Sequence, residues 1–188
     1  MQQIRRANCT TDYIQYNASF AYNIMMTSND DKQKIEEKIG EALGLEMAAQ
    51  KAVEELGSKG LLDEGGMKDK LEKMRKQANN HQTDLEELIL SPSLGLDSIN
   101  IQKVANETVQ KGSEMMKAYL GETPDASEAI EFLCLAEGGE VTHYEVLSAM
   151  TKKLVKDRKF SAKVKAILEE EKKHLQLCTK LAKQIAVQ

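Results

Sequence analysis

The sequence contains no tryptophan, only two prolines and 4% aromatic residues, so it is poor both in residues that favour β-sheets and in residues that break helices. Its net charge is a mild −4, with both signs interspersed. This pattern offers no basic footprint for nucleic acid and no basic amphipathic face for a membrane surface. No apolar run approaches the roughly 18 residues of a membrane-spanning helix. We therefore expect neither nucleic acid nor a membrane as a partner.

The three cysteines are too few and too irregularly spaced for a disulfide scaffold. Free thiols are typical of the reducing cytosol. The N-terminal segment lacks the continuous apolar stretch of a secretory signal. These features predict a cytoplasmic protein in which residues 1–30 form a poorly ordered N-terminal arm.

Ala, Leu, Met, Glu and Lys are abundant, and these residues favour helices. The stretch SNDD at 28–31 supplies an N-cap and an acidic first turn. Four further breaker segments divide the rest of the chain: GSKGLLDEGG, SPSLG, GETPDAS and VKDRK. The expected helices cover residues 31–56, 67–90, 100–120, 126–153 and 161–186.

This order of elements is a helical hairpin, a long connection and a second helical hairpin. It predicts an all-α, antiparallel four-helix bundle over residues 31–188, with a short extra helix in a crossover at about 93–124. A chain of 188 residues is long enough to bury one sizeable core, so a single domain is expected.

Each of the four long segments carries an apolar stripe at helical spacing, and each stripe is interrupted near its midpoint by one ionisable residue. The interrupting residues are Glu46, His81, Glu140 and Glu171. Residues at one level of an antiparallel hairpin have numbers that are symmetric about its turn. By this test Glu140 lies level with Glu171, and Glu46 lies level with Ala78, one turn before His81. The four interruptions are therefore expected at a common depth.

A single glutamate on an apolar face is usually a partly exposed boundary residue, and a lone histidine is usually a core residue with satisfied hydrogen bonds. Several converging carboxylates are different, because they repel one another and are costly to bury. Hard metal cations bound by carboxylate oxygen and imidazole nitrogen would remove this conflict. The pattern therefore predicts a buried metal site.

Glu171 and His174 form a Glu-x-x-His element like the one found in ferritin-like di-iron and di-manganese carboxylate proteins. Residues 31–187 resemble that superfamily in length and connectivity. Within it the chain is most similar to the YciF-like family of stress-associated ferritin-like proteins, through THYEVLSAM at 142–150 and LEEEKKHLQLCTKLA at 168–182. The resemblance implies a ferritin-like bundle that binds one or two Fe or Mn ions per chain.

The resemblance also implies a ligand set, which is Glu46, His81, Glu137, Glu140, Glu171 and His174. Either Glu137 or Glu140 would be the main carboxylate of its helix. The glutamate expected three residues before His81 is Ala78, which leaves open an asymmetric pair of ions, a single ion or a relic site. We expect Glu171 and His174, with Glu140 and Glu46, to hold the firmest ion, and His81 to serve the second position.

Two functions follow from these expectations. In the first, bound Fe or Mn reacts with O2 or peroxide, in a redox or oxidative-stress role, because carboxylates stabilise higher-valent metal ions. In the second, the chain is a helical stress or assembly protein with a degenerate metal site and no catalysis. A homo-oligomer, in the simplest case a dimer, is expected in both. A storage shell is disfavoured because the extra C-terminal helix of shell-forming ferritins is not evident.

Overall fold

A computed structural model describes residues 28–63, 66–155 and 157–187, and the described residues contain five α-helices and no strand. The helices are α2 (Asn29–Ser58), α3 (Met67–Ile89), α4 (Ser98–Leu120), α5 (Ala126–Leu154) and α6 (Arg158–Ile185). The all-α prediction is confirmed for this part of the chain. Residues 1–27, most of the predicted N-terminal arm, lie outside the described residues. None of the described helices has both the length and the apolar character needed to cross a membrane.

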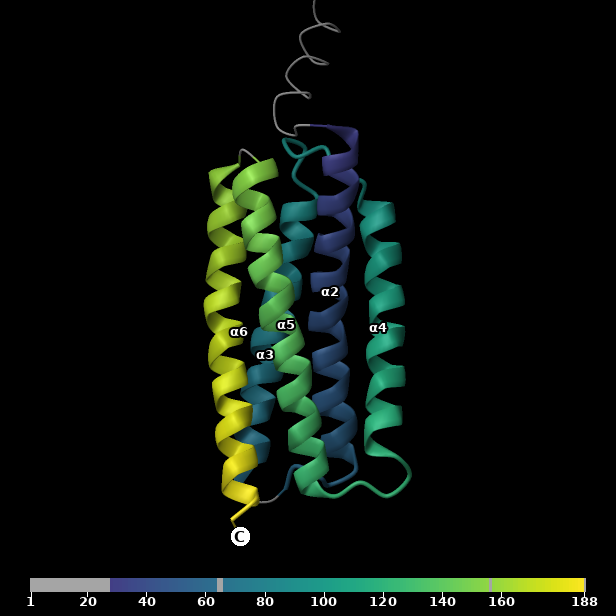
Figure 1. Ribbon diagram of the computed structural model, residues 1–188, viewed down its shortest axis with the longest axis vertical. Coiled ribbons are helices and arrows are strands. Elements are labelled where there is room, and N and C mark those ends of the chain that lie inside the picture. Colours follow the sequence, from purple (N-terminus) through teal and green to yellow (C-terminus); the bar gives the residue numbers. More distant parts are fainter. Residues whose placement is uncertain (1–27, 64–65, 156, 188) are drawn as a thin grey trace, which may run out of the picture.

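The helices run side by side along the long axis of the molecule (Figure 1). Helices α2 and α3 form one hairpin, and α5 and α6 form the other. The two hairpins meet where α2 packs on α5 and α3 packs on α6. Helix α4 lies on the outside of α2 and has a smaller contact with α5. The arrangement is a helical bundle with α4 as an added fifth helix.

Side-chain caps explain where the helices begin. The Ser28 hydroxyl accepts a hydrogen bond from the Asp31 amide at 3.1 Å and starts α2, as the SNDD stretch predicts. Asp125 and Glu128 form a capping box at the start of α5. The Asp157 carboxylate accepts from the Phe160 amide at 2.9 Å, so α6 begins at Arg158. The predicted start at 161 was therefore three residues too late.

The predicted short crossover helix is in fact long, because α4 has 23 residues, as many as α3. It approaches α2 closely at two glycines. A Cβ atom at Gly44 would lie 2.5 Å from the carbonyl oxygen of Ala105, and one at Gly40 would lie 2.8 Å from that of Ile101. The Glu36 carboxylate of α2 also accepts a hydrogen bond from the Asp97 amide at 2.7 Å. Helix α4 is thus an integral part of the bundle.

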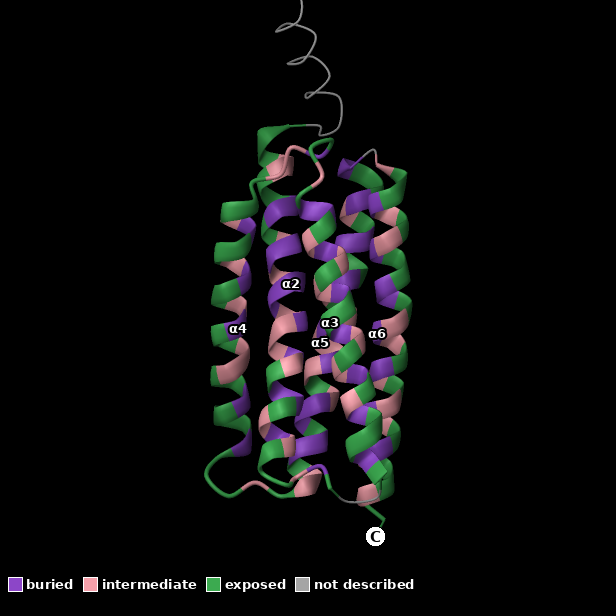
Figure 2. Ribbon diagram, turned by 180° about the vertical axis from the view of Figure 1, so that it is seen from behind, coloured by how far each residue is buried: buried purple, intermediate pink, exposed green. Residues whose placement is uncertain are grey.

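The apolar core consists of two clusters, one towards each end of the bundle. The first includes Ile39, Leu43, Leu85, Leu147 and Val164, and the second includes Val53, Leu71, Met74, Ile130 and Leu181. Buried residues face the inside along all the long helices (Figure 2). In the sequence of each bundle helix, the predicted metal-ligating residues fall between the members of the two clusters. A buried polar layer thus divides the core.

Candidate metal centre

All six predicted ligands are buried, with exposed fractions between 0 and 4%. They are Glu46 on α2, His81 on α3, Glu137 and Glu140 on α5, and Glu171 and His174 on α6. Residues three or four apart share one face of a helix, which is why α5 and α6 each present a pair. The structure brings five of the six into two groups of three whose ligand atoms lie within 4.8 Å of one another.

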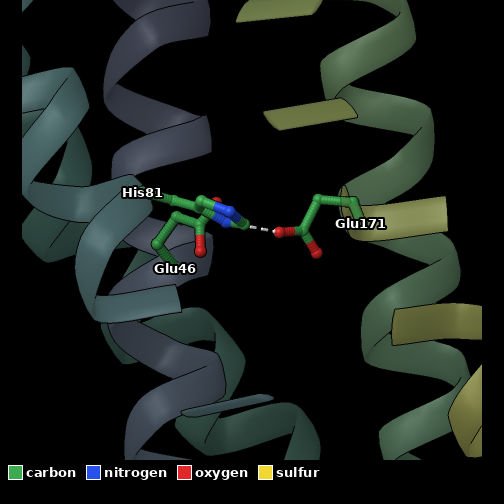
Figure 3. Close-up of side chains that lie close together, drawn as sticks. All are labelled: Glu46, His81 and Glu171. Carbon is green, nitrogen blue, oxygen red and sulfur yellow. Dashed lines mark ion pairs between the residues drawn. The ribbon is translucent and has the colours of Figure 1, made fainter. Parts of the chain in front are cut away.

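The first group is Glu46, His81 and Glu171 (Figure 3). The Nδ1 atom of His81 lies 2.7 Å from Oε1 of Glu171 and 3.3 Å from Oε1 of Glu46. Although these contacts are short, His81 Nδ1 has no partner in hydrogen-bond geometry. The Tyr144 hydroxyl donates a hydrogen bond to Oε1 of Glu46 at 2.6 Å, which fixes this carboxylate from the α5 side.

The second group is Glu137, Glu171 and His174. The Nδ1 atom of His174 lies 3.2 Å from Oε2 of Glu171 and 3.7 Å from Oε2 of Glu137. Glu171 therefore belongs to both groups and offers a different oxygen to each histidine. This grouping differs from the predicted one, since Glu46 lies with His81 and Glu137 takes the place expected for Glu140.

Glu140 is also buried, but it belongs to neither three-residue group. It is nevertheless close enough to Glu137 and Glu171 for their charges to act on it. On the other side, Glu140 lines a cavity between α2, α4 and α5. The two glutamates of α5, which are three residues apart, therefore face different surroundings.

The outer nitrogen of each histidine also has a polar neighbour. His81 Nε2 lies 3.0 Å from Oε2 of Glu170, and His174 Nε2 lies 3.3 Å from Oε1 of Gln77. Gln77 in turn donates to the same Glu170 oxygen at 3.3 Å. Metal-ligating histidines commonly bond an acceptor of this kind through their second nitrogen. Each Nδ1 is left on the side of the carboxylate cluster, as a metal ligand requires.

Glu170 is a site residue that the sequence analysis missed. Its side chain is 43% exposed and lies one position before Glu171 on α6. Glu170 lies off the apolar stripe of α6, so helical spacing alone does not mark it. The usable signal was the run of three glutamates at 169–171, since a carboxylate beside a helical ligand can reach a histidine of the neighbouring helix.

The first group compensates its own charge. Burial alone would lower the pKa of His81, but its contacts with Glu171 and Glu46 raise it to about 11. Burial would raise the pKa of Glu171, yet His174 and His81 hold it at about 2. Burial and the charge of Glu171 raise the pKa of Glu46 to about 7, in spite of His81 and Tyr144. A protonated His81 thus acts as the cation of this group at neutral pH.

For the α5 carboxylates, burial and neighbouring carboxylates outweigh the nearby histidines. Burial, followed by the charges of Glu171 and Glu46, raises the pKa of Glu137 well above its usual range. Burial, followed by the charges of Glu137 and Glu171, does the same for Glu140. These groups are therefore held neutral by protons where no cation is bound.

Several polar atoms of the cluster lack a hydrogen-bond partner. They are Oε2 of Glu46, Oε2 of Glu137, Oε1 of Glu171 and Nδ1 of His81. Buried polar atoms without partners are rare and costly in native proteins. All four are of the kinds that ligate Fe and Mn, and all belong to the two groups of three. The residues present therefore fit one or two metal ions.

Comparisons with protein-family models, with curated proteins and with solved structures gave no match to this chain. The fold and the site geometry described above are therefore the basis for a functional assignment.

Proposed function

We propose that this chain is a ferritin-like metal-binding protein that holds two Fe or Mn ions in its buried polar layer. Glu46 and His81 would ligate one ion, and Glu137 and His174 would ligate the other. Glu171, which belongs to both groups, would help to hold both ions. The observation that supports this most directly is that the two oxygens of Glu171 contact the Nδ1 atoms of the two histidines, at 2.7 and 3.2 Å.

The ions, when bound, would supply redox chemistry with O2 or peroxide, which suits a role in oxidative stress. The protein's own residues do the positioning. Tyr144 orients Glu46, and Gln77 and Glu170 bond the outer nitrogens of the histidines. Apolar clusters pack above and below the layer. Glu140 stands beside the two ligand groups as a further carboxylate.

A second function is supported by one specific observation. The pKa of about 11 means that His81 can carry a positive charge beside Glu46 and Glu171 without a metal ion. Ala78 also stands where the resemblance calls for another bridging glutamate. The chain would then be a helical stress or assembly protein whose polar layer is the relic of a metal site. A cytoplasmic homodimer stays the expectation for both functions.

Metal analysis of protein purified without chelator separates the two functions. We expect close to two Fe or Mn ions per chain, and anaerobic titration of metal-stripped protein should show the same stoichiometry. Glu171→Ala should abolish tight binding of both ions because both groups share this residue. Glu169→Ala is the matched control, since that side chain is 57% exposed on the same helix. Equal affinity in the Glu171→Ala variant and the parent would favour the relic site.

A further inference from the structure

A cavity of about 870 Å³ opens between α2, α4 and α5, on the side of the polar layer away from α3 and α6. Small residues line it on all three helices, among them Ala52, Gly112 and Gly139. Larger apolar side chains complete the walls, namely Met115, Met116, Tyr119, Phe132 and Leu135. This volume lies within the range of about 300–1,000 Å³ that is typical of small-molecule sites.

The cavity reaches the candidate metal centre through one residue. Glu140 is only 2% exposed, and yet it lines the cavity. The same side chain interacts with Glu137 and Glu171 of the polar layer. A molecule in the cavity would therefore place one end beside the carboxylate cluster while the rest of it contacts apolar walls.

Burial of the inner end of the cavity, rather than the charges around it, disfavours an anion there. Its ionisable lining residues are Lys51, Glu54, Glu55, Glu140 and His143, and Glu55 is already paired with Lys59 at 2.8 Å. His143 already lies 3.6 Å from Glu41. A charged headgroup would lose its hydration at the buried inner end beside Glu140, whereas an uncharged oxygen could hydrogen-bond there.

We propose that this cavity binds a neutral, mostly apolar small molecule whose single polar oxygen lies at the inner end, beside Glu140. If the bound molecule is also a substrate for chemistry at the metal ions, that part of the proposal rests on the proposed function. Binding itself does not, because the cavity is formed by the protein alone. Burial of the apolar walls drives binding, and Glu140 sets the orientation.

Two adjacent glycines provide a matched test of binding. A Cβ atom at either Gly138 or Gly139 would meet no atom within 4 Å, so both positions accept a side chain. Only Gly139 lines the cavity. We expect the neutral dye Nile red to bind the parent at one site, and Gly139→Leu to weaken this binding at least tenfold. Gly138→Leu should bind the dye like the parent.

Competition tests the chemistry of the ligand. We expect 1-decanol to displace Nile red at concentrations at least tenfold lower than decanoate, which has the same chain length and a negative charge. Displacement by decanoate at equal or lower concentration would overturn the preference for a neutral ligand. Unchanged dye affinity in Gly139→Leu would overturn the site itself. The site would also be overturned if the parent bound no small molecule and the Gly139→Leu variant lost its dimer. That result would mean that a second copy of the chain covers the cavity.

Metal content separates this proposal from the proposed function. Both leucine variants should retain the parent's metal stoichiometry, and dye binding should persist in metal-stripped protein. In Mn-loaded protein, the hydroxymethyl protons of 1-decanol should relax faster than its terminal methyl protons, because the inner end lies beside Glu140. Faster relaxation of the methyl group would overturn the orientation. If no Mn binds, the proposed function fails while the dye measurements still decide the cavity.

Discussion

The two halves of the polar layer hold carboxylates by different physical means. In the half formed by Glu46, His81 and Glu171, a histidine with a pKa of about 11 supplies the positive charge. In the half that contains Glu137 and Glu140, the pKa of both carboxyls is raised well above its usual range, and protons take the place of a cation. The difference teaches that a metal ion would have to displace a histidine proton on one side and carboxyl protons on the other. A bound metal ion should therefore stabilise the half that contains Glu137 and Glu140 more than the other half.

The largest expected effect is the pH dependence of the metal-free protein. The pKa of Glu46 is about 7 in the folded state and about 4.5 when unfolded, so its folded form binds the proton more tightly. A raised folded pKa contributes stability that is present below pH 4.5 and is lost as pH rises through 7. His81, also raised, adds a loss between its unfolded pKa of 6.5 and about 11. The pKa of Glu171, lowered to about 2, changes stability only below pH 4.5.

Glu46 alone should cost about 3 kcal/mol of stability between pH 5 and pH 8, at about 1.4 kcal/mol per pKa unit. For a chain of this length, the melting temperature should fall by roughly 6–12 °C. Thermal unfolding of metal-stripped protein over this range checks the sign. A melting temperature that climbs from pH 5 to pH 8 would contradict the clustering of raised carboxylates.

The next effect is the contrast between the two histidines. His174→Ala removes a ligand from the group in which the pKa of Glu137 is raised, and we expect about 100-fold weaker binding of that ion. His81→Ala removes a ligand and also the proton that competes with the metal. It should mainly lower the stoichiometry, with a smaller change in the affinity of the remaining ion. Anaerobic Mn titration of both variants measures this, and equal effects would erase the difference between the halves.

A smaller effect is expected from adding the glutamate that the resemblance to ferritin-like proteins calls for three residues before His81. Ala78 is buried on α3, one turn before His81. Ala78→Glu should strengthen binding of the ion held by Glu46 and His81 by about tenfold, and it should destabilise the metal-free protein through like-charge repulsion. Asn80→Glu adds the same charge at an exposed position of the same helix and serves as the control. A matching gain in the control would mean that general charge is responsible.

The smallest effect concerns Tyr144, which donates a hydrogen bond to Glu46 but to no residue of the other half. Tyr144→Phe should weaken binding of the Glu46 ion by about 1 kcal/mol, the usual net value of a hydrogen bond. Binding at the Glu137 and His174 group should not change. Titration resolved into its two steps is the measurement. Loss at both steps would show that the halves are coupled more tightly than their separate contacts suggest.

The sequence predicted the parts of this molecule that depend on periodicity. Helical spacing identified Glu46, His81 and Glu171 as inward-facing, and the symmetry of the hairpins placed them at one depth; the structure brings these three together. Whether they bind metal stays a prediction. Local capping chemistry likewise predicted the N-cap at Ser28, although α2 begins at Asn29, two residues before the predicted start at 31.

Features that depend on contacts between helices were not predictable in this way. Glu137 and Glu140 lie three residues apart on the same face of α5, so only the positions of the neighbouring helices decide which of them meets His174. Glu170 reaches His81 across the α3–α6 contact, which no single-helix pattern reveals. The start of α6 was missed because Arg158 and Lys159 suggest a loop, whereas the Asp157 cap outweighs this composition.

The glycine contact between α2 and α4 has a consequence for how the molecule can change by substitution. Because the carbonyl oxygen of Ala105 leaves no room for a Cβ at Gly44, the backbones themselves set the spacing of the two helices there. Replacing a lining side chain such as Met115 would change the residues that form the cavity wall but not the spacing of the helices. Replacing Gly44 with alanine would instead move the wall, and with it the α2 backbone that carries Glu46. The width of the cavity and the position of Glu46 therefore both depend on the absence of a side chain at Gly44.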